Sequence, residues 1–131
     1  MDAMPILIVE NYAILREILR LILELEGYIV YEARDGCEAL HYLRASAQPL
    51  IVLLDWHLPG LPGRAALYAL AADAPQARRH AYILYTAASC PLDLLAQVPP
   101  GFRVTTLSKF SGVDELLYAV KQAINQIAGD R

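Results

Sequence analysis

The sequence predicts an α/β domain built on one five-stranded parallel sheet, doubly wound so that helices cover both faces and make three layers. Five short β-type runs alternate with helical stretches, and right-handed connections between parallel strands then place helices on both faces. The first, third and fourth runs are apolar almost throughout, which is typical of strands buried on both faces. The expected strands are Ile6–Val9, Tyr28–Glu32, Leu50–Leu54, Ala81–Thr86 and Arg103–Leu107.

The first expected helix covers Tyr12–Glu26. Its apolar residues recur every three or four positions and share one stripe of the helix surface. The members of this stripe are Leu15, Ile18, Leu19, Ile22 and Leu25. Gly27 stands where the helix should stop, since glycine is common just past a helix end.

Four more helices are expected, one after each later strand. Asp35 can cap a helix over Gly36–Arg44, and a third helix covers Gly63–Ala72. Only Pro91–Val98 is available for the fourth, because two prolines and a glycine at 99–101 close it early. The fifth covers Val113–Ile127. Its inward residues are Leu116, Leu117, Val120 and Ile124.

Length, charge and cysteine content exclude several classes of protein. The 131 residues suit a single domain over 1–131, and their formal net charge of −3 argues against direct nucleic-acid or membrane partners. No apolar run reaches the roughly 18 residues that span a bilayer, and the N-terminal MDAMP lacks the basic start of a signal peptide. Cys37 and Cys90 form no CxxC pair, so we expect reduced thiols and a cytoplasmic location.

Polar residues follow the strands at the edge where an open parallel sheet binds its ligands. They are Glu10 and Asn11 after the first strand, Asp55 after the third, Thr86 at the end of the fourth, and Ser108 with Lys109 after the fifth. Oxygen ligands suit a hard divalent cation, while an ammonium and a hydroxyl can donate to phosphoryl oxygens. The set predicts a site for a divalent cation and an anion.

Four segments in order resemble the receiver domain of bacterial two-component response regulators. They are ILIVENYAILREIL, VLLDWHLPGLPG, ILYTAAS and LSKFSGVDELLYAV, and the resemblance extends over essentially the whole chain. It implies a flavodoxin-like fold in which Asp55 is the nucleophile that accepts a phosphoryl group from a phosphohistidine. Lys109 would pair with the phosphoryl oxygens, and Thr86 would hydrogen-bond to them.

The resemblance also implies a cofactor and partners. Mg²⁺ would be held by Asp55, by Glu10 and Asn11 directly or through water, and by the main-chain carbonyl of His57. The phosphoryl donor would be a sensor histidine kinase or a phosphotransfer protein, and the signal would pass to a downstream output protein or domain. The protein would be a signalling switch rather than a metabolic enzyme. A homodimer through the fourth and fifth helices is a further option.

Three residues depart from the family pattern. Asn11 stands where the family has a metal-binding aspartate. The attraction between one carboxylate charge and a metal ion about 4 Å away is worth up to roughly 4 kcal/mol. Because Asn11 lacks this charge, we expect Mg²⁺ affinity to fall tenfold or more. Phe110 replaces the usual proline after the lysine, which predicts a trans bond between Lys109 and Phe110. Thr106 replaces an aromatic residue, which excludes an aromatic rotamer switch at this position.

Two other functions stay open at this point. A pseudo-receiver would keep the fold, take little or no phosphoryl group because of Asn11, and act as a constitutive protein-binding module. A flavin or nucleotide enzyme could use the same fold, but such sites cradle phosphate with glycines or hydroxyls, whereas the Glu-Asn-Tyr-Ala turn at 10–13 would repel it.

Several of these residues also have simpler interpretations. Asp55 before a Pro-Gly turn is typical of a turn residue, and Glu10 with Asn11 is typical of a helix cap. We expect His41 and His57 to be surface residues, because no second ligand stands at metal spacing. Trp56 is interpreted as an exposed loop aromatic or a partner contact.

Overall fold

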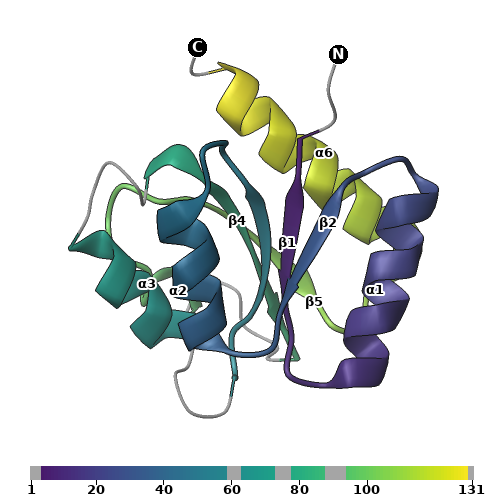
Figure 1. Cartoon of the computed structure of the whole chain (residues 1–131), viewed down its shortest axis with the longest axis horizontal. Coiled ribbons are helices and arrows are strands. Elements are labelled where there is room, and N and C mark those ends of the chain that lie inside the picture. Colours follow the sequence, from purple (N-terminus) through teal and green to yellow (C-terminus); the bar gives the residue numbers. More distant parts are fainter. Residues whose placement is uncertain (1–3, 59–62, 73–77, 88–93, 130–131) are drawn as a thin grey trace.

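The computed structural model describes residues 4–58, 63–72, 78–87 and 94–129 and contains one sheet of five parallel strands (Figure 1). The strands are β1 (Ile6–Val9), β2 (Val30–Ala33), β3 (Ile51–Asp55), β4 (Ala81–Thr86) and β5 (Arg103–Ser108). Their order across the sheet is β2-β1-β3-β4-β5, which is the flavodoxin-like arrangement. The predicted doubly wound α/β fold is confirmed.

Helices cover both faces of this sheet. They are α1 (Ala13–Leu25), α2 (Gly36–Ala45), α3 (Gly63–Ala71) and α6 (Val113–Gly129). Figure 1 shows α1 and α6 on one side of the strands and α2 with α3 on the other. The predicted helix at Pro91–Val98 begins outside the described residues; within the described part, only Leu94 and Leu95 are helical before a turn. No helix in the described ranges is long and apolar enough to cross a membrane.

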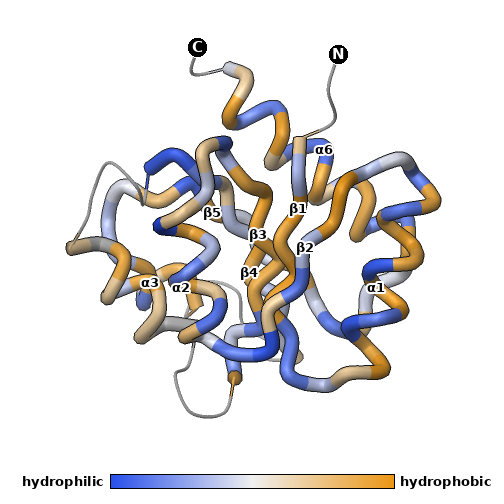
Figure 2. Tube along the Cα trace, in the orientation of Figure 1, coloured by the Kyte–Doolittle hydropathy of each residue, from blue (hydrophilic) through white to orange (hydrophobic). Residues whose placement is uncertain are grey.

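The core consists of two clusters, one on each face of the sheet. Alternate residues of a strand point to opposite faces, so Leu54 packs toward α2 and α3 while Leu53 packs toward α1 and α6. β1, β3 and β4 are buried along their whole length, and Figure 2 shows the corresponding hydrophobic centre of the sheet. The apolar runs in the sequence therefore located these strands, although β3 is Ile51–Asp55 rather than the predicted Leu50–Leu54, so Asp55 is its last residue.

The second strand begins two residues later than predicted. Gly27 adopts a φ of 91°, and the Tyr28 amide donates to the carbonyl of Leu23 at 3.2 Å, so both residues close α1. A positive φ is easy only for glycine, which explains why the chain turns here. β2 is consequently Val30–Ala33 rather than Tyr28–Glu32.

The predicted apolar stripe of α1 is only partly correct. Leu19 and Leu23 are buried, whereas Ile18 is 48% exposed and Leu25 is 88% exposed. Each residue turns a helix by about 100°, so Ile18 and Leu25 lie well to one side of the line through Leu19 and Leu23. In α6, by contrast, the predicted inward residues Leu116 and Val120 are buried.

A buried histidine joins three elements at the amino-terminal edge of the sheet. His80 is fully buried just before β4; its Nδ1 accepts a hydrogen bond from the Leu50 amide at 2.9 Å. Because Nδ1 is an acceptor, Nε2 carries the proton, and it donates to the carbonyl of Leu43 in α2 at 2.9 Å. Burial lowers the pKa of His80, the bond to Leu43 raises it, and the charge of Arg79 lowers it, with a net decrease.

Candidate functional site

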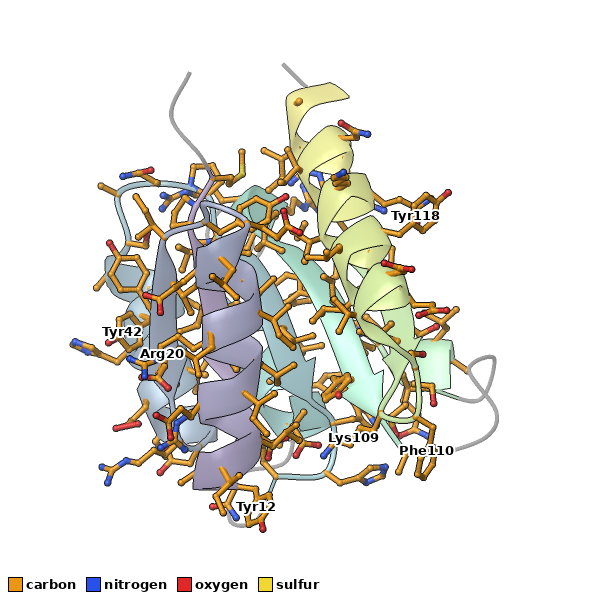
Figure 3. All side chains as sticks on the ribbon, turned by 90° about the vertical axis from the view of Figure 1, so that its right-hand side faces the viewer. Tyr12, Arg20, Tyr42, Lys109, Phe110 and Tyr118 are labelled. Atoms are coloured by element: carbon orange, nitrogen blue, oxygen red, sulfur yellow. The ribbon has the colours of Figure 1, made fainter. Side chains whose placement is uncertain are left out.

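Two carboxylates and one ammonium meet at the carboxyl-terminal edge of the sheet. Lys109 Nζ lies 2.9 Å from Asp55 Oδ2 and 3.3 Å from Glu10 Oε1. Glu10 is 3% exposed and Asp55 is 5% exposed, while the Lys109 side chain is 25% exposed. Figure 3 shows Lys109 at the same end of the molecule as Tyr12, which precedes α1. The predicted gathering of these strand ends is therefore present.

Backbone amides hold both carboxylates in place. Asp55 Oδ1 accepts from the His57 amide at 3.0 Å, and Glu10 Oε2 accepts from the Tyr12 amide at 3.0 Å. Each carboxylate therefore uses one oxygen for a backbone amide and the other for Lys109. The arrangement fixes the two acids while leaving the ammonium as their shared, partly exposed partner.

The surroundings favour the charged form of Lys109. Burial lowers its pKa, but the hydrogen bond to Asp55 and the charges of Asp55 and Glu10 raise it, so the net pKa lies above the ordinary value. The Tyr85 ring lies beneath the ammonium, with its centroid 5.6 Å from Nζ, which is within the range of a cation–π contact. Sequence reasoning missed this role of Tyr85.

Thr86 lies beside the cluster at the end of β4. It is buried, and its carbonyl accepts from the Lys109 amide at 2.9 Å. The register pairs Asp55 with Tyr85, so Thr86 lies one residue beyond the phosphoacceptor candidate. Ser108 is the exposed last residue of β5 rather than a residue after it, and its Oγ accepts from the Phe110 amide at 3.1 Å. The structure thus brings Thr86 to this edge and gives Ser108 a role in the turn.

Asn11 and His57 lie at the border of the site. The side chain of His57 is exposed, as predicted, although its backbone amide reaches Asp55. Asn11 is also exposed, and the N-cap of α1 is Tyr12 rather than Asn11. The interpretation of Asn11 as the helix cap is therefore wrong, while Glu10 supplies the side-chain bond to the Tyr12 amide.

Trp56 is buried, and its interpretation as an exposed aromatic is wrong. It is only 4% exposed and packs in the cluster beneath α2 and α3, together with Leu58. The Trp56 amide donates to the carbonyl of Tyr85 at 3.1 Å, which continues the β3–β4 pairing past Asp55. This extension of the strand directs the indole into the core.

The donor set of the cluster suits Mg²⁺. Glu10 and Asp55 offer only oxygen ligands, and one or two carboxylates completed by water are the usual protein environment of this ion. Among the residues that the structure describes, no three His, Cys, Asp or Glu side chains gather to hold a metal. The residues present thus fit Mg²⁺ with two anionic ligands, and Asn11 could add only a neutral oxygen.

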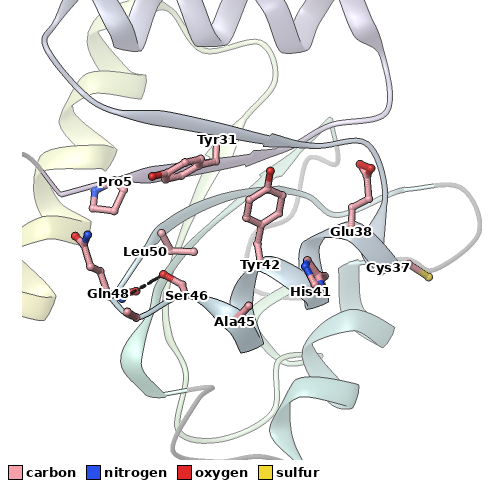
Figure 4. Close-up of a pocket in the computed structure, with 11 residues that line it drawn as sticks. Pro5, Tyr31, Cys37, Glu38, His41, Tyr42, Ala45, Ser46, Gln48 and Leu50 are labelled. Carbon is pink, nitrogen blue, oxygen red and sulfur yellow. Dashed lines mark hydrogen bonds between the residues drawn. The ribbon is translucent and has the colours of Figure 1, made fainter.

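Two further features concern the peptide bond after Lys109 and a cavity away from the site. The described ranges contain no cis peptide bond, so the bond between Lys109 and Phe110 is trans, as predicted. A surface cavity of about 770 Å³ lies elsewhere, between β2 and α2, where the Tyr31 and Tyr42 rings lie 5.9 Å apart (Figure 4). Glu10, Asp55 and Lys109 take no part in its lining, so the ion cluster is a separate site.

The fold and this cluster define the class of the protein, and comparison with known proteins gives the family. The model of the family "Response regulator receiver domain" matches residues 6–121. The chain therefore belongs to the receiver domain family of response regulators, the signalling modules of two-component systems.

Curated relatives are similar to this chain in sequence, and solved structures share its fold. The aerobic respiration control protein ArcA of Escherichia coli is 41% identical over 63 residues, which cover 48% of this chain and 26% of ArcA. The matched stretch thus spans about a quarter of that relative. The receiver domain of a sensor histidine kinase from Pseudomonas aeruginosa PAO1, solved with magnesium in its active-site cleft, is 24% identical, with a TM-score of 0.80. That comparison covers 95% of this chain and 99% of the other.

A third comparison involves a receiver bound to a partner. The receiver domain of Ssk1 from Saccharomyces cerevisiae, solved in complex with the histidine phosphotransfer protein Ypd1, is 20% identical and has a TM-score of 0.80. The comparison covers 96% of this chain and 92% of the other. At this identity, the likeness shows the shared fold.

Proposed function

We propose that the chain accepts a phosphoryl group at Asp55 from a phosphohistidine of a sensor histidine kinase or phosphotransfer protein. The observation that carries this proposal is the position of Lys109 Nζ, 2.9 Å from Asp55 Oδ2 and 3.3 Å from Glu10 Oε1. A buried carboxylate beside a cation, at the ligand-binding edge of a parallel sheet, is suited to a reaction that adds negative charge.

In the proposed reaction, a carboxylate oxygen of Asp55 attacks phosphorus and forms a new P–O bond. The P–N bond to the donor imidazole breaks, and its electron pair stays on the imidazole nitrogen. Lys109 then hydrogen-bonds a phosphoryl oxygen instead of sharing its charge between Asp55 and Glu10. The Thr86 hydroxyl donates to a second phosphoryl oxygen and so links the end of β4 to the phosphorylated state.

Asp55, Glu10, the main-chain carbonyl of His57 and the Asn11 amide oxygen are the groups that would hold Mg²⁺. When bound, this ion neutralises negative charge that develops on the phosphoryl oxygens. The output would be a change of surface read by a downstream protein or domain, and the reduced thiols expected from the sequence fit a cytoplasmic role.

A pseudo-receiver is the second candidate function. It is favoured by the exposed Asn11, which contributes no charge, so the described part of the site holds two carboxylates. Such a domain would bind its partner constitutively and would take up little or no phosphoryl group.

Incubation with Mg²⁺ and acetyl phosphate, followed by intact-mass measurement, separates the two candidates. The proposal expects an adduct of one phosphoryl group that is lost in Asp55→Asn. A wild-type chain that stays unmodified across a wide range of Mg²⁺ concentrations would leave the pseudo-receiver as the function.

A further inference from the structure

Arg16 lies beside the ion cluster and joins three elements of the fold. It is the fourth residue of α1, and its Nη1 donates to the main-chain carbonyl of Glu10 at 2.9 Å. Its Nε lies 3.4 Å from Oε1 of Glu32 in β2. Arg16 therefore ties the start of α1 to the residue that follows β1 and to the neighbouring strand.

The burial of Arg16 indicates a fixed side chain rather than a solvated charge. Its side chain is 16% exposed, compared with 35% for Arg20 one turn further along α1. Charged side chains are seldom buried unless they are paired. The strand register explains the pairing, because Glu32 lies opposite Ile8, which packs on the face of the sheet that α1 covers. Glu32 consequently projects toward this helix.

The bond from Arg16 completes the set of hydrogen bonds on Glu10. The Glu10 amide donates to the Ala33 carbonyl at 3.1 Å. Its Oε2 accepts from the Tyr12 amide, and its Oε1 accepts from Lys109. The guanidinium supplies the partner of the carbonyl. Each hydrogen-bonding group of this buried acid is thus held by the protein, and the bond from Arg16 is one that a substitution removes without changing a carboxylate or Lys109.

This bond also orients the link between two candidate metal ligands. The Glu10 carbonyl and the Asn11 amide belong to one planar peptide group, so a donor that fixes the oxygen fixes the whole plane. Glu10 and Asn11 project from the two ends of that plane. A hydrogen bond from a charged donor is roughly twice as strong as a neutral one, so the guanidinium of Arg16 is well suited to hold the plane.

We propose that Arg16 is a positioning residue of the metal site, held in place by Glu32, and that it strengthens Mg²⁺ binding through Glu10. The inference rests on the metal site of the proposed function. Replacing residues that orient metal ligands typically lowers metal affinity by about 10- to 100-fold. A guanidinium suits this position because its rigid fork reaches the Glu10 carbonyl and Glu32 together, whereas a lysine ammonium is a single point charge.

The sign of the change in affinity separates positioning from simple electrostatics. The guanidinium and Mg²⁺ are both positive, so their repulsion alone predicts tighter Mg²⁺ binding when the charge of Arg16 is removed. Loss of positioning predicts weaker binding, because the peptide between Glu10 and Asn11 would then have to be ordered when the ion binds. A role in folding alone predicts lower stability with unchanged affinity in the folded chain.

Isothermal titration calorimetry of the full chain with Mg²⁺ alone tests the proposal. Arg16→Met keeps the apolar stem, removes every donor and should weaken binding about tenfold. Arg16→Lys should lie between wild type and Arg16→Met, because an ammonium can still reach one of the two acceptors. Urea denaturation shows that each variant is folded and measures any separate loss of stability.

Arg20→Met is the matched control for this titration. It removes the same charge from the same helix, at a residue whose acidic neighbours are Glu17 and Glu24. Figure 3 shows Arg20 farther along α1 from the end of the molecule that carries Tyr12 and Lys109. Water and salt screen a partly exposed charge, so Mg²⁺ affinity should stay within about twofold of wild type.

A double-mutant cycle tests the role of Glu32. Glu32→Ala alone should weaken Mg²⁺ binding about threefold, because Arg16 keeps its bond to Glu10 but loses its second anchor. In the Arg16→Met background, the same substitution should have no further effect, since Glu32 acts through Arg16.

Phosphorylation by acetyl phosphate gives a readout that a catalytic group would change differently. Arg16→Met should raise the Mg²⁺ concentration needed for half of the maximal rate by the same factor as in calorimetry. The rate at saturating Mg²⁺ should stay close to wild type. Loss of a group that touches the phosphoryl oxygens, such as Lys109, would lower the saturating rate instead.

Four results would overturn the proposal. They are unchanged or tighter Mg²⁺ binding in folded Arg16→Met, an equal loss of affinity in Arg20→Met, additive losses in the cycle with Glu32→Ala, and a wild-type chain that binds no Mg²⁺. Failure of the proposed function looks different. A wild-type chain that binds Mg²⁺ and responds to Arg16→Met, but takes up no phosphoryl group, would keep the positioning role and leave the pseudo-receiver as the function.

Discussion

The two ends of the sheet each hold a buried polar centre, but the centres are built differently. At the amino-terminal edge, neutral His80 is fully buried and bonds to the backbone of Leu50 and Leu43. At the carboxyl-terminal edge, Lys109 bridges the carboxylates of Asp55 and Glu10 and stays partly exposed. One centre is neutral with backbone partners, and the other is ionic with side-chain partners.

This difference indicates which end stabilises the fold and which end can react. The partners of His80 are backbone groups that cannot leave, so changing this residue leaves a buried donor and acceptor without bonds. Lys109 can exchange one oxygen partner for another without moving the backbone. We therefore expect changes at the amino-terminal edge to alter stability and changes at the carboxyl-terminal edge to alter phosphorylation.

The largest expected effect is the loss of the ammonium. Lys109→Met should slow phosphorylation by acetyl phosphate about 100-fold, because a positioned donor to the phosphoryl oxygens is lost. The rate is measured by intact mass over time at saturating Mg²⁺. Lys121→Met on α6, where Lys121 is exposed, is the matched control and should keep the wild-type rate. An unchanged rate in Lys109→Met would show that the ammonium at the carboxyl-terminal edge does not assist phosphorylation.

The second expected effect is a loss of folding stability when His80 is replaced. His80→Leu should lower the free energy of unfolding by about 2–4 kcal/mol, because the Leu50 amide and the Leu43 carbonyl both lose their partner. Urea denaturation measures this change. His41→Leu, at an exposed position of α2, should change it by no more than about 0.5 kcal/mol. Equal effects of the two substitutions would contradict the role assigned to His80.

A restored negative charge should strengthen the metal site. Asn11→Asp should raise Mg²⁺ affinity about tenfold or more, since a third carboxylate would lie beside Asp55 and Glu10. Isothermal titration calorimetry measures the affinity. Asn125→Asp adds the same charge near the end of α6, at an exposed position, and should have no such effect. Equal affinities for wild type and Asn11→Asp would show that the missing charge is compensated.

A smaller effect is expected from the ring beneath Lys109. Tyr85→Leu should slow phosphorylation about 2- to 10-fold, which corresponds to the loss of one cation–π contact. Tyr85→Phe keeps the ring and should stay close to wild type. If Phe and Leu slow the reaction equally, the hydroxyl or the packing of Tyr85 matters rather than its ring face.

The smallest effect is the dependence of stability on pH. The pKa of folded His80 lies below the ordinary value, so the unfolded chain binds the proton more readily. The contribution of His80 to stability is therefore complete above the ordinary histidine pKa of about 6.5 and decreases as pH falls below it. Urea denaturation at pH 7 and 5 should show a larger loss for wild type than for His80→Leu. Equal losses of stability in wild type and His80→Leu would show that groups other than His80 cause the sensitivity to acid.

The strands and most of the site could be predicted because they follow from simple rules. A strand buried on both faces must be apolar throughout, and β1, β3 and β4 have this composition. The carboxyl ends of parallel strands lie at the same edge of a sheet. The sequence therefore predicted that Glu10, Asp55 and Lys109 lie close together. Neither rule requires knowledge of how the side chains pack.

The errors concern the direction in which side chains point. α1 is apolar over more than half of its circumference, so the sequence alone did not show that Leu23 is buried while Leu25 is exposed. Trp56 looked like a loop residue because a Pro-Gly pair follows it closely, yet the β3–β4 pairing continues past Asp55. Tyr85 lies beneath Lys109 only because of the strand register.

The burial of Trp56 gives the protein an internal optical reporter. The sequence contains one tryptophan, which is 4% exposed and directly follows Asp55 in the chain. Its indole packs on the face of the sheet that α2 and α3 cover. Its backbone amide donates a hydrogen bond to the carbonyl of Tyr85, whose ring contacts Lys109. A change of charge at the carboxyl-terminal edge should therefore alter the emission of this indole, so that binding of a phosphoryl mimic can be followed in real time without a label.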